Sequence, residues 1–67
     1  MKAKYIKDLK KGELFTLKPV KYPNENIVWV RNHYDKGSKK YAAYKYSDIN
    51  HEMFLKGDRV CYVDFIF

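Results

Sequence analysis

The fold predicted for this chain depends on one stretch, residues 28–46, which reads VWVRNHYDKGSKKYAAYKY. Two runs of β-branched and aromatic residues flank a Lys36-Gly37 pair, and glycine supplies the positive φ that tight turns require. The stretch therefore predicts a β-hairpin whose strands cover residues 27–34 and 40–46.

The register of this hairpin determines which side chains share a face. With Lys36-Gly37 at the centre of the turn, Tyr34 is expected opposite Lys39 and Val30 opposite Ala43. One face then carries a small apolar set suited to a core: Val28, Val30, Tyr41 and Ala43. The other face alternates aromatic rings with positive charges, across Trp29, Arg31, His33, Lys40, Ala42, Tyr44 and Tyr46.

Similar turn signals occur on both sides of the hairpin, at Lys11-Gly12 and Lys56-Gly57. They bound further predicted strands at residues 4–9, 14–18 and 59–67. One short helical turn is expected near residues 48–54, because Ser47 or Asp48 is a good helix cap and Ile49 and Met53 are one turn apart. We therefore predict a mainly β protein with a single domain, residues 1–67, built as a five-stranded antiparallel barrel of SH3-like or OB-like type or as a bent sheet.

Composition favours a binding protein with a negatively charged partner. The chain has 14 Lys and Arg against 8 Asp and Glu, a formal charge of +6, and a pI near 9.5. Basic proteins bind polyanions by releasing counterions. There is one cysteine and no apolar run long enough to span a membrane, so a soluble, cytoplasmic protein is expected.

The second face of the hairpin is the candidate binding surface, because aromatic rings stack on bases and positive charges neutralise phosphates. The predicted contacts to single-stranded DNA or RNA are Trp29, Arg31, Lys36, Lys39, Lys40, Tyr44, Lys45 and Tyr46. Two alternatives remain open. Trp29 can instead be a core side chain with Tyr44 and Tyr46 packed beside it, or the same face can bind or inhibit another protein.

Catalysis is not expected, since the chain offers no paired nucleophile and base, no cofactor loop and no metal set. His51-Glu52 begins like a zinc-binding HExxH motif, but Leu55 occupies the position of the second histidine. Cys61 alternates with Val63 and Phe65 on the last strand, so it is expected to face inward and to be unreactive. No cofactor or metal is predicted.

The last strand is apolar on both faces, which suits a central barrel strand or a contact with a second chain. A monomer and a homodimer therefore both remain open. Leaving its three final apolar residues exposed would forgo a burial free energy of roughly 1.5–3 kcal/mol for each. The strand is therefore expected to pair up to Phe67, with Phe65 in the core and Phe67 closing one end of the barrel.

Several segments together resemble a group of short β-rich proteins encoded on bacterial phages and conjugative elements. They are KDLKKGELF, VWVRNHYD with KKY, YSDINHEMFLKGDRV and a closing VDFIF. The resemblance implies a small β-rich domain of mobile-element origin. Mobile-element proteins of this size are commonly nucleic-acid-binding accessories or inhibitors that block a host protein. The resemblance implies no catalytic residues.

Overall fold

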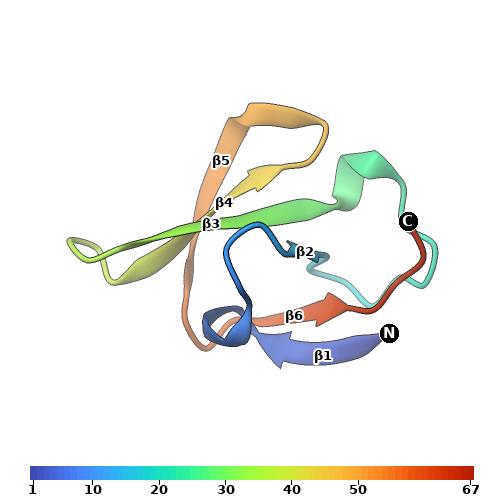
Figure 1. Ribbon diagram of the computed structural model, residues 1–67, viewed down its shortest axis with the longest axis horizontal. Helices are drawn as coiled ribbons and strands as arrows, with labels where there is room; N and C mark the ends of the chain where they lie inside the picture. The colour runs from blue at the N-terminus through green and yellow to red at the C-terminus, as the bar shows by residue number, and fades with distance from the viewer.

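A computed structural model describes residues 1–67 and shows six β-strands and two short 3-10 helices (Figure 1). In chain order they are β1 (Lys2–Tyr5), η1 (Ile6–Asp8), β2 (Leu14–Phe15), η2 (Glu25–Ile27), β3 (Trp29–Asp35), β4 (Lys40–Lys45), β5 (Asp48–Lys56) and β6 (Val60–Val63). The predicted mainly β class is confirmed. Neither of the two short helices could span a bilayer.

The strands form two antiparallel sheets, in the orders β1-β6 and β2-β3-β4-β5. A bridge between Thr16 and Tyr62 links them, with backbone hydrogen bonds of 3.0 and 2.9 Å. The strands do not close into the predicted barrel, and there are six of them instead of five. Closure would need a ladder between β5 and β1, but η1 lies at that position. It donates two backbone hydrogen bonds to the turn after β5, from the Lys7 amide to the Gly57 carbonyl (3.2 Å) and from the Ile6 amide to the Arg59 carbonyl (2.9 Å).

The helical turn predicted near residues 48–54 is wrong, because these residues form most of β5. Asp48 does accept a backbone amide as a cap would, but the donor is Asn50, at 3.1 Å, as in an Asx turn. From Glu52 to Lys56 the strand pairs regularly with β4. An isolated helix of two turns is marginal in water, so the long-range ladder with β4 overrides the local helical signal.

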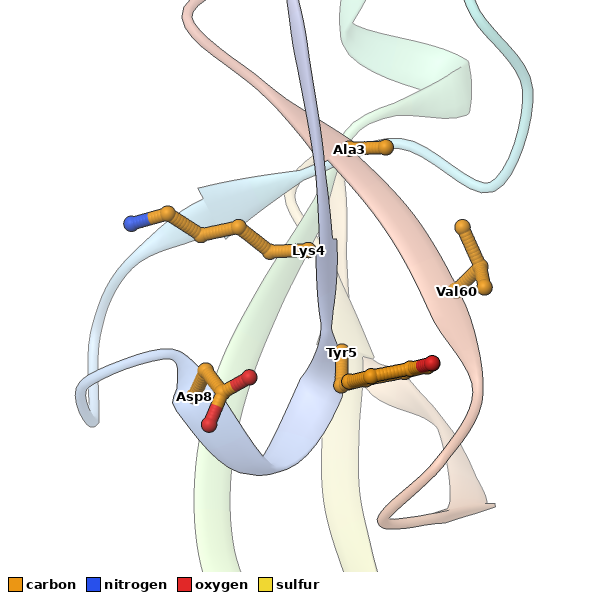
Figure 2. A pocket seen from close by; sticks show the side chains of 5 residues that line it. All are labelled: Ala3, Lys4, Tyr5, Asp8 and Val60. Atoms are coloured by element: carbon orange, nitrogen blue, oxygen red, sulfur yellow. The ribbon is translucent and has the colours of Figure 1, made fainter.

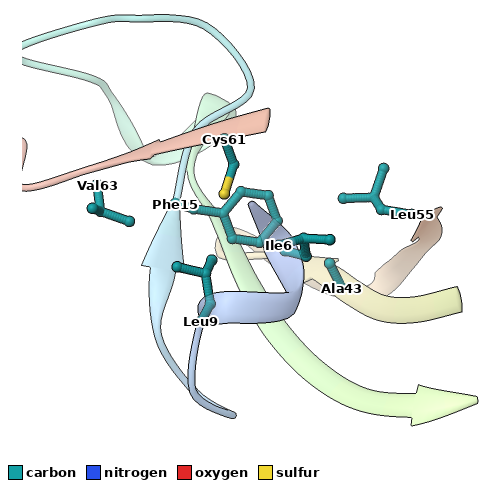
Figure 3. Close-up of a cluster of buried hydrophobic side chains, with 7 residues drawn as sticks. All are labelled: Ile6, Leu9, Phe15, Ala43, Leu55, Cys61 and Val63. Atoms are coloured by element: carbon teal, nitrogen blue, oxygen red, sulfur yellow. The ribbon is translucent and has the colours of Figure 1, made fainter. Parts of the chain in front are cut away.

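The core lies between the two sheets (Figure 3). Figure 3 shows the Phe15 ring at its centre, with the Cys61 sulfur directed toward the ring. Its buried members come from both sheets, from η1 and from the loop after it: Ile6, Leu9, Phe15, Ala43, Leu55, Cys61 and Val63. The inward position predicted for Cys61 is confirmed.

The hairpin forms where it was predicted, but its register differs. Asp35 pairs with Lys40, which leaves a four-residue loop, and Trp29 pairs with Lys45. A bulge between Arg31 and Tyr34 shifts the pairing again along β3. The Asp35 carboxylate stabilises this turn by accepting hydrogen bonds from the Gly37 amide (3.2 Å) and the Ser38 hydroxyl (2.8 Å).

A one-residue change of register moves side chains to the opposite face of a sheet. Trp29 and Arg31 therefore share a face with Ala43 and Lys45, and this face lies toward the core. Tyr44 pairs with Val30 on the other face. The two faces predicted for the hairpin are thus wrong in their membership.

The prediction for the C-terminal residues is also wrong. Strand β6 ends at Val63, and Asp64 turns the chain with a φ of 59°. Phe65 is half-buried outside the core cluster, and Phe67 remains 53% exposed. The segment instead returns toward the residues before η2, where the Ile66 amide donates to the Lys21 carbonyl at 2.9 Å (Figure 1).

Candidate nucleic-acid interface

The surface hollow over β1 offers little chemistry (Figure 2). Tyr5 and Val60 form one side of it, whereas Lys4 and Asp8 extend to the other side of the strand. Binding sites bring several polar groups together around an apolar wall. These residues do not converge in that way, so this hollow is not the candidate site.

A second hollow, which we call the Trp29 cleft, combines an aromatic ring with positive charges. It has a volume of about 280 Å³. Its walls come from the segment after β2, from η2 and from the ends of β3 and β4, and are formed by Thr16, Leu17, Lys18, Asn26, Ile27, Trp29 and Lys45. The volume is just below the roughly 300–1,000 Å³ of drug-sized ligand sites, which leaves room for about one base.

The Trp29 ring is held firmly on its inner side. The side chain is half-buried and packs against the core cluster. The His51 ring of β5 meets it edge to face, with centroids 5.5 Å apart and planes at 79°. An aromatic ring fixed in this way loses little side-chain entropy when a ligand stacks on its remaining surface.

Two lysines line the same cleft. Lys45 pairs directly with Trp29 across the β3–β4 ladder. Lys18 comes just after β2, and Phe15 of β2 pairs with Trp29 on its other side. The Thr16 hydroxyl donates to the Lys18 carbonyl at 2.7 Å and fixes the backbone there. The cleft therefore places positive charge beside a half-buried aromatic ring.

The structure brings together only some of the predicted contact residues. Trp29, Arg31 and Lys45 share one face, whereas Tyr44 lies on the opposite face. Tyr46 contacts the Phe67 ring at a centroid distance of 4.9 Å. Of the alternatives for Trp29, the structure shows a ring that belongs partly to the core and partly to the cleft.

The remaining predicted lysines lie at the far end of the hairpin, which projects from the body of the molecule (Figure 1). Lys36 and Lys39 are in the turn and Lys40 begins β4. With a strand rise of about 3.3 Å per residue, the turn is roughly 20 Å from Trp29. These lysines are therefore too far away to line the Trp29 cleft.

Arg31 belongs to a separate stack along the hairpin. Its guanidinium lies 4.5 Å from the centroid of Tyr41, and Tyr41 is 4.7 Å from Tyr34. One terminal nitrogen donates to the Asn32 carbonyl at 2.7 Å, and Nε is buried without a partner. Packing on Tyr41 thus holds Arg31 within the hairpin.

The sequence-based prediction missed Lys18. This lysine comes before the Pro19 loop, far from Trp29 in the sequence, so no local pattern joins the two residues. Only the β2–β3 register, in which Phe15 pairs with Trp29, places Lys18 near the ring. That register would have been the signal to look for.

Two pKa shifts describe the remaining chemistry. Hydrogen bonds from the Ser38 hydroxyl and the Gly37 amide lower the pKa of Asp35, so this carboxylate stays ionised among the lysines of the turn. Burial raises the pKa of the Cys61 thiol from 9.0 to about 11, and its Sγ donates to the Lys4 carbonyl at 3.4 Å.

No three His, Cys, Asp or Glu side chains lie close enough together to hold a metal ion.

No match was found when the chain was compared with protein-family models, with curated proteins and with solved structures. The resemblance to phage and mobile-element proteins therefore stays a prediction.

Proposed function

We propose that the protein binds single-stranded nucleic acid without sequence specificity, with one base stacked on Trp29 and the adjacent phosphates near Lys18 and Lys45. The observation that carries the proposal is the half-buried Trp29 ring in a cleft that two lysines also line. Stacking on an aromatic side chain contributes about 1–3 kcal/mol per base and tolerates any base. The overall charge of +6 adds long-range attraction for a polyanion.

The contacts are few, so the affinity should be modest and sensitive to salt. On a single strand, the slope of log K against log salt is about −0.7 for each neutralised phosphate, which gives about −1.4 for two lysines. At about 50 mM salt the two lysine contacts contribute roughly 2.5 kcal/mol and one stacked base adds about 1–3 kcal/mol, so the expected Kd lies between about 0.1 and 3 mM. The lysines of the hairpin turn add to the overall positive potential of the protein but make no contact in the cleft.

Fluorescence tests the proposal directly because Trp29 is the only tryptophan in the chain. Titration with short homopolymeric DNA and RNA strands at about 50 mM salt should quench the emission, since the bases stack on the ring. Lys18→Ala and Lys45→Ala should each weaken binding by roughly five- to tenfold at this salt. Lys11→Ala removes the same charge outside the cleft and should have a clearly smaller effect.

The outcome against the proposal is equally specific. Unchanged Trp29 emission and no binding at low salt would remove the nucleic-acid function and favour the protein-interaction alternative. Equal losses in Lys11→Ala and in the cleft variants would show that binding is due to overall charge and does not use the cleft.

A further inference from the structure

Strand β5 is the unpaired end of the larger sheet. In the order β2-β3-β4-β5 it has a neighbour on one side only, and its nine residues make it the longest strand of the chain. Proteins commonly protect such edges with lysine, proline or short strands. The edge strand β1 has Lys2 and Lys4 within four residues, whereas β5 has no proline and no lysine before Lys56.

The side chains of β5 divide between the core and the solvent. Met53 packs against the core cluster and Leu55 is a member of it. Glu52, Phe54 and Lys56 lie on the opposite face by strand alternation. Phe54 is 45% exposed, although it pairs with the fully buried Ala42 on β4.

A like-charge pair lies beside Phe54. Lys40 on β4 pairs directly with Lys56 on β5, so two positive side chains are opposite each other on the same face. Asp35 of β3 pairs with Lys40 from the other side, which leaves Lys56 without a carboxylate at a paired position. Like charges at directly opposite positions destabilise a sheet. A carboxylate placed next to Lys56 along the free edge would relieve this repulsion.

The chain itself contains a strand with the required pattern. Residues 52–56 read Glu-Met-Phe-Leu-Lys. When this segment pairs antiparallel with a second copy of itself, opposite charges face each other at its ends and apolar residues face each other between them. If two such segments pair antiparallel about Phe54, Glu52 lies opposite Lys56 of the partner subunit and Phe54 lies opposite its own counterpart. Both ion pairs and the aromatic pair are then on one face, which is the arrangement that a twofold axis through the middle of the strand pair produces.

We propose that a second copy of the chain binds at β5, so that two four-stranded sheets join into one through residues 52–56. Each ion pair places a glutamate of one subunit beside the Lys40–Lys56 pair of the other. The two exposed Phe54 rings cover each other across the axis, and cross-strand aromatic pairs are among the more stabilising pairs in sheets.

The structure also limits the length of this contact. The β4–β5 register breaks between Tyr44 and Lys45, which displaces residues 49–51 from regular pairing. At the other end, η1 contacts β5, and the Gly57 carbonyl just beyond Lys56 already accepts the Lys7 amide. Five residues per chain bury much less than the roughly 800 Å² per partner of standard interfaces, so the dimer should be weak and dependent on concentration.

Sedimentation equilibrium over protein concentrations from about 10 μM to 1 mM measures this association. The wild-type mass should rise from 8.1 kDa toward twice that value. Glu52→Lys and Lys56→Glu each place like charges opposite each other across the twofold axis, so each should weaken association at least fivefold. The double variant restores opposite charges at both positions and should recover it.

Matched variants separate the interface from general effects. Glu25→Lys carries the same charge change as Glu52→Lys but lies on η2, and it should dimerise more strongly than Glu52→Lys. Circular dichroism shows whether each variant retains the β fold. In a second measurement, Phe54→Cys should form an intermolecular disulfide faster than Ile49→Cys, because directly opposite Cα atoms lie within the span that a disulfide bridges.

Three results would overturn the proposal. The first is a wild-type mass of 8.1 kDa throughout the concentration range. The second is a folded double charge reversal that stays as weak as the single variants. The third is equal disulfide formation at positions 54 and 49. None of these results depends on nucleic-acid binding, so this inference and the proposed function can fail separately.

Discussion

At the scale of single residues, Cys61 shows how burial controls chemistry. The thiol is fully buried in the core, and its pKa is raised to about 11 because desolvation disfavours the thiolate. The thiolate is the reactive form of cysteine. We therefore expect a thiol reagent to modify the native protein at pH 8 much more slowly than the protein unfolded in guanidinium.

The same shift gives stability a pH dependence. An unfolded Cys61 loses its proton near pH 9.0, whereas the folded one keeps it until about pH 11. The stabilisation is therefore fully present below pH 9 and is lost as pH rises toward 11. Tyrosine and lysine titrate in the same range, so the measurement is the difference between wild type and Cys61→Ala in free energy of unfolding. This difference should shrink from pH 8.5 to pH 11, and a constant difference would contradict the assignment.

Asp35 offers a second residue-scale prediction. Its pKa is lowered first by the Ser38 hydroxyl and then by the Gly37 amide. Ser38→Ala should therefore raise the pKa of Asp35, as observed by NMR titration of its carboxyl carbon. The contribution of Asp35 to stability is present at neutral pH and is lost as pH falls through its lowered pKa. An unchanged pKa in Ser38→Ala would show that the turn does not depend on this hydrogen bond.

At the scale of elements, the C-terminal segment should matter less than its apolar composition indicates. Ile66 and Phe67 are 58% and 53% exposed, and Phe65 lies outside the core cluster. Removing residues 65–67 should lower stability by about 1–2 kcal/mol, mainly through the half-buried Phe65 ring. For a domain of this size, each 1 kcal/mol lowers the Tm by about 4–8 °C. A chain that no longer folds cooperatively would show that the segment belongs to the core.

At the scale of the whole molecule, Phe15 connects the two sheets. It is fully buried at the centre of a cluster with members from both sheets and from η1 (Figure 3). Phe15→Ala should destabilise the protein by about 3–5 kcal/mol, through lost burial and the cavity left behind. The core of so small a domain contributes little more than this loss to the total free energy of unfolding, so the variant should be largely unfolded at 25 °C. Phe54→Ala is the control, since this half-exposed ring should cost the monomer less than about 1.5 kcal/mol.

Much of the fold could be read from local patterns. The three turns lie at Gly12, Gly37 and Gly57 as predicted, since turn chemistry depends on the residues present at the turn. The alternation of Cys61 and Val63 correctly placed these side chains inward. Period-two alternation also predicted the mainly β class. These features depend on neighbours within a few positions, and the sequence contains that information directly.

The candidate site was only partly predictable. Trp29 and Lys45 were predicted and lie together, because residues on paired strands stay close over a range of registers. Tyr44 was assigned to the wrong face, since the turn closes one residue later than expected and β3 contains a bulge. Lys18 could not be placed from the sequence, because its position beside Trp29 depends on the pairing of β2 with β3.

The sequence by itself therefore determined the strands of the hairpin, the positions of the turns and the apolar residues available for the core. Tertiary structure alone decided the register of β3 on β4, the extended conformation of β5 and the end of β6 at Val63. The reason is energetic. Local propensities for short segments differ by about 1 kcal/mol, whereas burying one large side chain contributes about 1.5–3 kcal/mol. Where the two conflict, as at Glu52 to Lys56, the long-range contacts prevail.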